Sequence, residues 1–222
     1  MKISVIMPSY LGEFPGCAKN RKQKFVRALN SFLSQEHKEK ELVVISDGCP
    51  DTINILKAHY KNELADGRII LIELPRNPLF TGAVRQAGID KATGQILCNL
   101  DTDDYFMPGH LTSISEGFNT EKYDWVYFNH IDKPDELKDI DYAGKDGKLK
   151  VGVQQYFDCQ LKDEHICNAN VAWKSGLNIS WTGCDGKRDN WAFNKHLIEN
   201  FPNRKKIYGC GYVITHKILK KA

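Results

Sequence analysis

Short apolar runs that alternate with amphipathic segments constrain the fold of this chain most strongly. Between the first two runs, apolar residues recur from Phe25 to Leu33 with the spacing of a helix that buries one face. Further helices are expected just after "DGCPDT" (47–52) and over 82–92, the latter stopping at Gly94. The runs are nearly continuously apolar, which is typical of strands covered on both faces. They are residues 3–7, 42–46, 69–74 and 96–100.

Strands that alternate with helices of this length build βαβ units and hence a mostly parallel sheet. We therefore predict an α/β, Rossmann-like first half with helices on both faces of the sheet. The rhythm changes after residue 125, where we expect a mixed second half. No repeat or linker divides the 222 residues, so a single domain over 1–222 is predicted. The second half should contain strands at 125–129 and 170–173, a charged, turn-rich segment at 132–150 and a helix at 190–201.

Polar residues follow three of the four apolar runs. They lie at 8–10 after the first run, at 46–48 after the second and at 101–104 after the fourth. Ligands of parallel α/β sheets bind outside the carboxyl ends of the strands, where these three segments should meet. The sequence therefore predicts a ligand cleft at that edge of the sheet.

Three carboxylates, Asp101, Asp103 and Asp104, crowd into the last of these segments. Like charges at that spacing raise each other's proton affinity unless a cation, a basic side chain or water relieves them. A calcium-binding EF-hand loop is excluded, because its fifth and twelfth positions would be Tyr105 and Thr112. The cluster needs another explanation.

Three interpretations of the acidic cluster stay open. In phosphatases that form an aspartyl phosphate, a D-x-D pair supplies nucleophile and acid, but that pair usually ends the first strand rather than the fourth. In a structural interpretation, the acids cap a helix near Pro108, for which one carboxylate is enough. The favoured interpretation is a divalent metal site for a phosphorylated ligand, since Mg²⁺ takes one or two carboxylates plus water and phosphate oxygens.

Charge and cysteine content narrow the choice of partners. The formal net charge is only +3, so the basic clusters at 19–24 and 217–221 are interpreted as solvated faces. Contact with an anionic membrane surface is the alternative, and no nucleic-acid partner is predicted. Seven cysteines without a C-x-x-C pair favour neither a disulfide framework nor a zinc site.

No targeting or membrane-spanning segment is expected from the sequence. The apolar run before Pro8 is too short for a secretory signal, and no stretch approaches the roughly 20 apolar residues of a membrane span. We therefore predict a cytoplasmic protein without a transmembrane segment. Peripheral contact at the inner membrane face remains an alternative.

The order of three motifs resembles the family 2 glycosyltransferases, which bind nucleotide sugars in a GT-A fold. The motifs are "ISVIMPSY", "RALNSFLSQEHKEKELVVISDGCPDT" and "GAVRQAGIDKATGQILCNLDTDD". The resemblance covers residues 2–111 well and the remainder loosely. It implies a nucleotide-sugar-binding half at 1–111 and an acceptor-binding half at 112–222.

The resemblance also implies roles for individual residues. Asp47 matches the acid that bonds the nucleoside, Pro8 and Tyr10 match the lip of the base pocket, and Arg85 matches an arginine near the donor phosphates or sugar. An ordinary helix-surface charge is the alternative for Arg85. A bound Mn²⁺ or Mg²⁺ ion is implied as cofactor. The expected nucleotide-binding residues are Pro8, Tyr10, Asp47, Arg85 and Asp101, and the expected metal ligands are Asp101, Asp103, Asp104 and His216.

Four positions depart from the motifs of the family, namely Leu11, Ser46, Cys49 and Gln86. Because Ser46 and Cys49 flank the nucleoside-binding Asp47, they leave the identity of the base open, with uridine favoured. They also keep an alternative function open, a nucleotide-sugar-binding protein with impaired catalysis. The aspartyl phosphatase is the further alternative.

The resemblance implies metal-dependent transfer of a sugar to an acceptor hydroxyl, with inversion at the anomeric carbon. Such a reaction needs a base that takes the acceptor proton, and the family places this acid in its second half. Within "GCDGKRDNWAF", Asp189 is the favoured catalytic base and Asp185 the next candidate. Capping of the helix at 190–201 is the alternative for Asp189. The expected acceptor is a glycan, a lipid-linked molecule or a protein.

Overall fold

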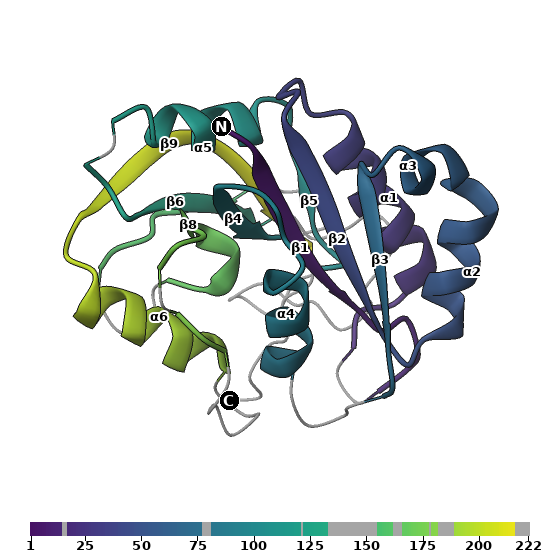
Figure 1. The fold of residues 1–222 in the computed structure, drawn as a ribbon. Coiled ribbons are helices and arrows are strands. Elements are labelled where there is room, and N and C mark those ends of the chain that lie inside the picture. The colour runs from purple at the N-terminus through teal and green to yellow at the C-terminus, as the bar shows by residue number, and fades with distance from the viewer. Residues whose placement is uncertain are drawn as a thin grey trace.

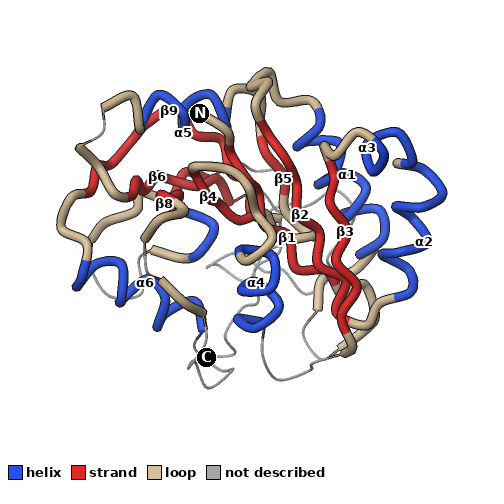
Figure 2. Tube along the Cα trace, viewed as in Figure 1, coloured by secondary structure: helices blue, strands red, loops and turns tan. Residues whose placement is uncertain are grey.

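The computed structural model describes residues 1–14, 17–76, 81–120, 122–132, 155–161, 166–177, 179–181 and 189–215. Its centre is one mixed sheet with helices packed outside it (Figure 1). Within the described residues, the strands lie side by side in the order β3-β2-β1-β4-β8-β6-β9-β5, and β7 pairs with β6. Figure 2 shows how the strands run as one layer through the molecule.

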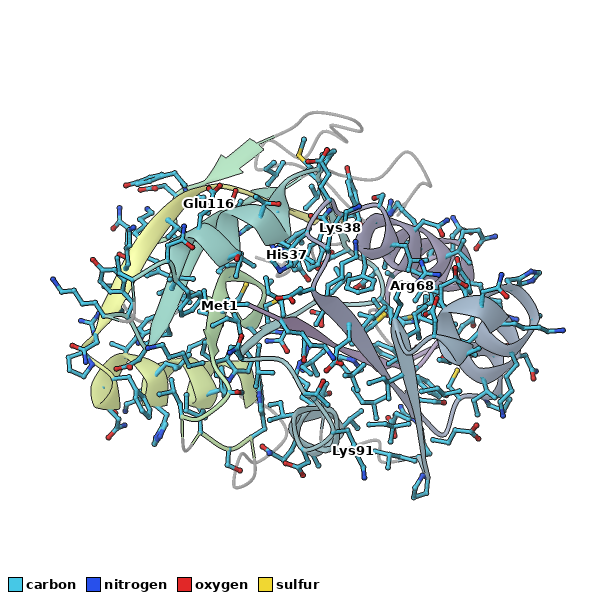
Figure 3. The ribbon with its side chains drawn as sticks, turned by 45° about the horizontal axis from the view of Figure 1, so that its top comes forward. Met1, His37, Lys38, Arg68, Lys91 and Glu116 are labelled. Carbon is cyan, nitrogen blue, oxygen red and sulfur yellow. The ribbon has the colours of Figure 1, made fainter. Side chains whose placement is uncertain are left out.

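The first half is parallel, as predicted. Its strands are β1 (Ile3–Ser9), β2 (Lys40–Asp47), β3 (Ile69–Leu74) and β4 (Ile96–Asn99), and β1 lies between β2 and β4. Each run is apolar because both of its faces are covered. Met1, Lys38 and Arg68 come just before β1, β2 and β3, and so mark the edge where these strands begin (Figure 3).

Helices cover both faces of this parallel part, which confirms the predicted α/β layering. On one face, Phe25 and Phe32 of α1 (Arg21–Leu33) pack with Val5 of β1. On the other, Val84 of α4 (Thr81–Ile89) packs with Ile6 of the same strand. The remaining helices of this half are α2 (Pro50–His59) and α3 (Lys61–Ala65), which lie on the side of α1 (Figure 1).

The second half is mixed, also as predicted. The antiparallel β8 (Val171–Lys174) lies between β4 and β6 (Trp125–Asp132), and a 3-10 helix over Asn168–Asn170 leads into it. The helix expected at 190–201 is α6 (Asp189–Asn200). Most of the turn-rich segment 132–150 lies outside the described residues. The other elements are β5 (Tyr105–Phe106), α5 (His110–Gly117) and β7 (Gln155–Phe157).

β9 (Arg204–Ile214), the longest described strand, was not predicted from the sequence. Its first half is rich in lysine and largely exposed, so it lacks the apolar run that marks the other central strands. β9 runs parallel to β6 and pairs with β5 through Tyr212 and Val213. It therefore brings residues near position 215 back to the acidic turn after β4.

One core cluster joins the two halves, with Val5 and Leu42 from the first and Val126 and Ile207 from the second. A second cluster around Trp173 and other aromatic side chains fills the space under α6. The assignment of 1–222 to a single domain stays a prediction.

Candidate functional site

A cavity of about 440 Å³ opens at the carboxyl ends of β1, β2 and β4, where the sequence predicts a ligand cleft. The parallel register explains this convergence, because Ser9 lies beside Ser46, next to Asp47, and Ile6 lies beside Asn99, two residues before Asp101. Its lining includes six of the predicted site residues, Pro8, Tyr10, Asp47, Arg85, Asp101 and Asp103.

One end of the cavity is built from Tyr10, Asp47 and Arg76. The Arg76 guanidinium carbon lies 3.6 Å from the centroid of the Tyr10 ring, and Arg76 Nη1 forms an ion pair with Asp47 Oδ2. Gly48 has a φ of +57°, and a Cβ there would lie 2.6 Å from the backbone nitrogen of Arg76. Only glycine allows this close approach.

Arg76 is a site residue that the sequence analysis missed. It follows the last residues of β3 in a segment without helical or strand periodicity, so its only signal was a basic residue after a predicted strand. Its ion pair leaves the predicted nucleoside acid Asp47 engaged, and its stacking covers one face of the Tyr10 ring.

Arg85 and Asp101 form the centre of the cavity wall. Arg85 is only 4% exposed, so it is not an ordinary helix-surface charge. Its Nη2 donates to Asp101 Oδ1 over 2.7 Å, which relieves part of the repulsion in the acidic cluster. The backbone N–H of Asp101 donates to Tyr212 Oη over 3.1 Å.

Asp104 turns away from the cavity toward β9. It is 5% exposed, and its two carboxylate oxygens accept hydrogen bonds from Tyr212 Oη at 3.0 Å and from the Thr215 N–H at 3.1 Å. Burial raises the pKa of Asp104 well above its ordinary value, and the charges of Asp103 and Asp101 raise it further. The two hydrogen bonds lower this pKa, but by less. Asp104 is not among the residues that line the cavity. Its role as a metal ligand stays a prediction.

The carboxylate oxygens that line the cavity are suitable ligands for a Mg²⁺ or Mn²⁺ ion. Asp101 and Asp103 both line it, and Arg85 engages only one oxygen of Asp101. Among the described residues, no group of three or more histidine, cysteine, aspartate or glutamate side chains could hold a metal. Two carboxylates are nevertheless enough for an ion that completes its shell with water and phosphate oxygens.

The side chains of the other predicted site residues are not described by the structure. Asp185 and His216 lie outside the described residues, although Thr215, the neighbour of His216, bonds to Asp104. Asp189 is the first residue of α6, and only its backbone is described. The role of base for Asp189 or Asp185 therefore stays a prediction.

Comparison with known proteins adds a family to this geometry. The model of "Glycosyl transferase family 2" matches residues 16–172. An uncharacterised glycosyltransferase of Nostoc sp. is 31% identical over 148 residues, covering 66% of this chain and 42% of the relative. The GalNAc(5)-diNAcBac-PP-undecaprenol beta-1,3-glucosyltransferase of Campylobacter jejuni is 24% identical over 208 residues, covering 94% of this chain and 56% of that protein. The chain thus spans about half the length of these relatives.

Solved structures with the same fold support the α/β architecture. S. aureus TarS 1–349 in complex with UDP superposes with a TM-score of 0.70 at 18% identity, covering 97% of this chain and 60% of TarS 1–349. The mannosyltransferase PcManGT of Pyrobaculum calidifontis, with GDP-Man and Mn²⁺, gives a TM-score of 0.62 at 12% identity over 99% of this chain and 57% of that one. At these identities the likeness shows the fold alone. Within the described part of the chain, no helix has the length and apolar character needed to span a membrane.

Proposed function

The chain belongs to glycosyl transferase family 2, and on that premise we propose that it transfers a sugar from a nucleotide diphosphate sugar to an acceptor hydroxyl. A UDP-sugar is the favoured donor, because UDP is bound by TarS, whose fold this chain shares. The observation that carries the proposal is a continuous cavity whose wall includes Tyr10 and Asp47 at one end and, further along, Arg85, Asp101 and Asp103. Its volume is in the range of small-molecule sites.

In this proposal the cavity binds the donor from base to sugar. Pro8 and Tyr10 flank the base, and the Asp47 carboxylate, which also pairs with Arg76, accepts its N–H. Arg85, paired with Asp101, lies near the phosphates. Asp101 and Asp103 would hold a Mn²⁺ or Mg²⁺ ion, with Asp104 and His216 as further candidate ligands, and such an ion neutralises negative charge on a departing diphosphate.

Transfer also requires removal of the acceptor proton, which we assign to the Asp189 carboxylate, with Asp185 as the alternative. The acceptor oxygen forms a bond to the anomeric carbon while the bond from that carbon to the diphosphate oxygen breaks. Attack opposite the leaving group inverts the configuration at that carbon. The name of the Campylobacter relative supports a lipid-linked acceptor, with glycan and protein as the other classes.

A thermal-shift panel tests the donor site. UDP, GDP, CDP and dTDP sugars are added to the wild-type chain with and without Mn²⁺. We expect stabilisation by one of them, greatest with Mn²⁺, because a ligand at about 100 times its Kd adds roughly 2.7 kcal/mol of stability. Asp103→Asn should lose the Mn²⁺-dependent part, whereas Asp66→Asn, at an exposed acid on the opposite edge, should keep it.

Transfer itself is tested by product analysis. With the donor found in the panel, Asp189→Asn should lose sugar transfer while it still binds the nucleotide, because only the base is removed. Full turnover in Asp189→Asn would contradict that assignment. A chain that binds the donor but never releases nucleotide would favour the impaired binding protein. Release of phosphate from simple phosphomonoesters would favour the phosphatase.

A further inference from the structure

Two neighbouring side chains of α4 reach different halves of the molecule. Arg85 donates to Asp101 Oδ1 over 2.7 Å, in the turn after β4. Gln86 accepts, at its Oε1, the backbone N–H of Trp181 over 3.0 Å. Gln86 is one of the departures from the family motifs, and its side chain is one methylene longer than the asparagine of the family. The contact fastens the segment around Trp181 to the helix that carries Arg85.

The Trp181 indole packs against the Arg85 guanidinium. The ring is 1% exposed, and its centroid lies 5.1 Å from the guanidinium carbon of Arg85. The same indole stacks on Phe193 of α6, with the centroids 4.2 Å apart and the planes at 9°. A cation against an indole is attracted more strongly where water is excluded, as it is here.

Packing, rather than hydrogen bonding, defines the contact between these two side chains. Trp181 Nε1 and Arg85 Nε are both buried and have no hydrogen-bond partner among the described residues. The Arg85 guanidinium donates a hydrogen bond to Asp101 through Nη2. The position of the Arg85 guanidinium therefore depends on its hydrogen bond to Asp101 on one side and on packing against the Trp181 indole on the other.

The packing of Trp181 against Arg85 affects how the Asp101 carboxylate is oriented. Arg85 holds one of its carboxylate oxygens, and the carboxylate is 32% exposed, so rotation about its side-chain bonds is limited mainly by that ion pair. If the indole moved away, Arg85 would gain room and Asp101 would lose its fixed orientation toward the cavity. Groups behind metal ligands commonly act in this way, by orienting the ligand rather than touching the ion.

We propose that Trp181, anchored by Gln86, is a positioning residue that keeps Arg85 on Asp101 and so prepares Asp101 to bind a metal ion and the donor diphosphate. This inference rests on the proposed function, because it assumes that Asp101 binds the donor complex. It assigns a task to a tryptophan of the second half and to a residue that departs from the family motifs.

A matched control is available in the same aromatic cluster. Trp173 is 2% exposed and also contacts Phe193, with the centroids 5.0 Å apart, whereas the Arg85 guanidinium lies against the ring of Trp181. Trp181→Leu and Trp173→Leu therefore remove similar buried aromatic area, but only the first removes the contact with Arg85. Trp181→Phe keeps an aromatic ring and loses no hydrogen bond seen in the described part of the chain, where the indole N–H has no partner.

The experiment measures binding of Mn²⁺, alone and with UDP, by calorimetry and by the electron paramagnetic resonance signal of free Mn²⁺. We expect Trp181→Leu and Gln86→Leu to weaken Mn²⁺-dependent binding by about 10-fold or more, as loss of an orienting partner does at metal sites. Trp181→Phe should restore binding close to wild type. Trp173→Leu should bind as wild type, even where its melting temperature falls as far as that of Trp181→Leu.

Each outcome decides the matter. If Trp181→Leu binds as well as Trp173→Leu, the positioning role is overturned while the proposed function stands. If the wild-type chain takes up neither Mn²⁺ nor UDP, both fail. If Trp181→Leu does not fold, Gln86→Leu decides, because Gln86 is half-buried and loses only its hydrogen bonds to the Trp181 N–H and Asp90. Binding by Gln86→Leu equal to wild type would then reject the inference.

Discussion

His110 is buried without a hydrogen-bond partner for either ring nitrogen among the described residues. It lies 4.1 Å from Phe106, centroid to centroid, and also packs edge-on against Phe128 and Tyr212. Burial lowers the pKa of His110 from 6.5 to about 3, so the ring stays neutral in the folded chain. Its surroundings show a packing role.

This environment predicts a pH-dependent stability. The unfolded chain binds a proton at His110 below pH 6.5 and the folded chain only near pH 3, so the free energy of unfolding should fall as the pH drops through that window. His110→Phe should raise the free energy of unfolding by about 1–3 kcal/mol, because it removes an unsatisfied buried polar group. It should also flatten the pH dependence.

Urea unfolding of wild type and His110→Phe, at neutral pH and at about pH 5, measures both effects. His37→Gln, at a more exposed histidine, serves as the control and should show the same pH dependence of the free energy of unfolding as wild type. An equal loss of stability on acidification in wild type and His110→Phe would contradict the assignment.

At the scale of single elements, the turn between β2 and α2 determines where Arg76 lies. Gly48 and Gly67 both have positive φ angles, +57° and +78°, but a Cβ at Gly67 would meet nothing within 4 Å. Both substitutions to alanine therefore cost backbone strain of about 1–2 kcal/mol. Gly48→Ala additionally forces the backbone of Arg76 away.

We expect Gly48→Ala to unfold at a lower temperature than Gly67→Ala and to alter UDP binding, because the turn carries Asp47 and its partner Arg76. Gly67→Ala should bind UDP as wild type. Thermal melts and calorimetry of the two variants give both comparisons. Identical UDP binding by the two variants would show that the closeness of Gly48 to Arg76 does not matter for the site.

The elements also show what the sequence could predict. β1 to β4 were predictable because strands buried on both faces must be apolar throughout, and α1 because its stripe has helical spacing. β9 was not, because its first half begins with three basic residues and Ile207 is its one buried residue there. The hydrogen bonds that Tyr212 and Thr215 donate to Asp104 could not be predicted for the same reason, since Tyr212 lies in that strand and Thr215 directly follows it.

At the scale of the whole molecule, Tyr212 joins the two halves at the acidic turn. Its hydroxyl donates to Asp104 and accepts from the backbone of Asp101, and the residue is fully buried. Tyr212→Phe should therefore lower the free energy of unfolding by about 1–3 kcal/mol, since it leaves buried groups unpaired. It should also weaken Mn²⁺-dependent UDP binding, because the turn loses its anchor.

Tyr60→Phe is the matched control. Tyr60 is 7% exposed and its hydroxyl donates to Asn30 over 3.0 Å, within the first half and away from the acidic turn. This variant should lose about 1 kcal/mol of stability and bind UDP as wild type. Chemical unfolding and calorimetry separate the two effects, and equal UDP affinity in Tyr212→Phe and wild type would contradict the anchoring role.

The return of β9 to the turn after β4 has a consequence during synthesis. A nascent chain that has emerged from the ribosome as far as β4 can already pair its parallel strands. The residues that donate hydrogen bonds to Asp104, however, come more than a hundred positions later in the chain. Until they emerge, that carboxylate has only water to solvate it. Donor-binding competence should therefore arise only after β9 has been synthesised and has paired with β6.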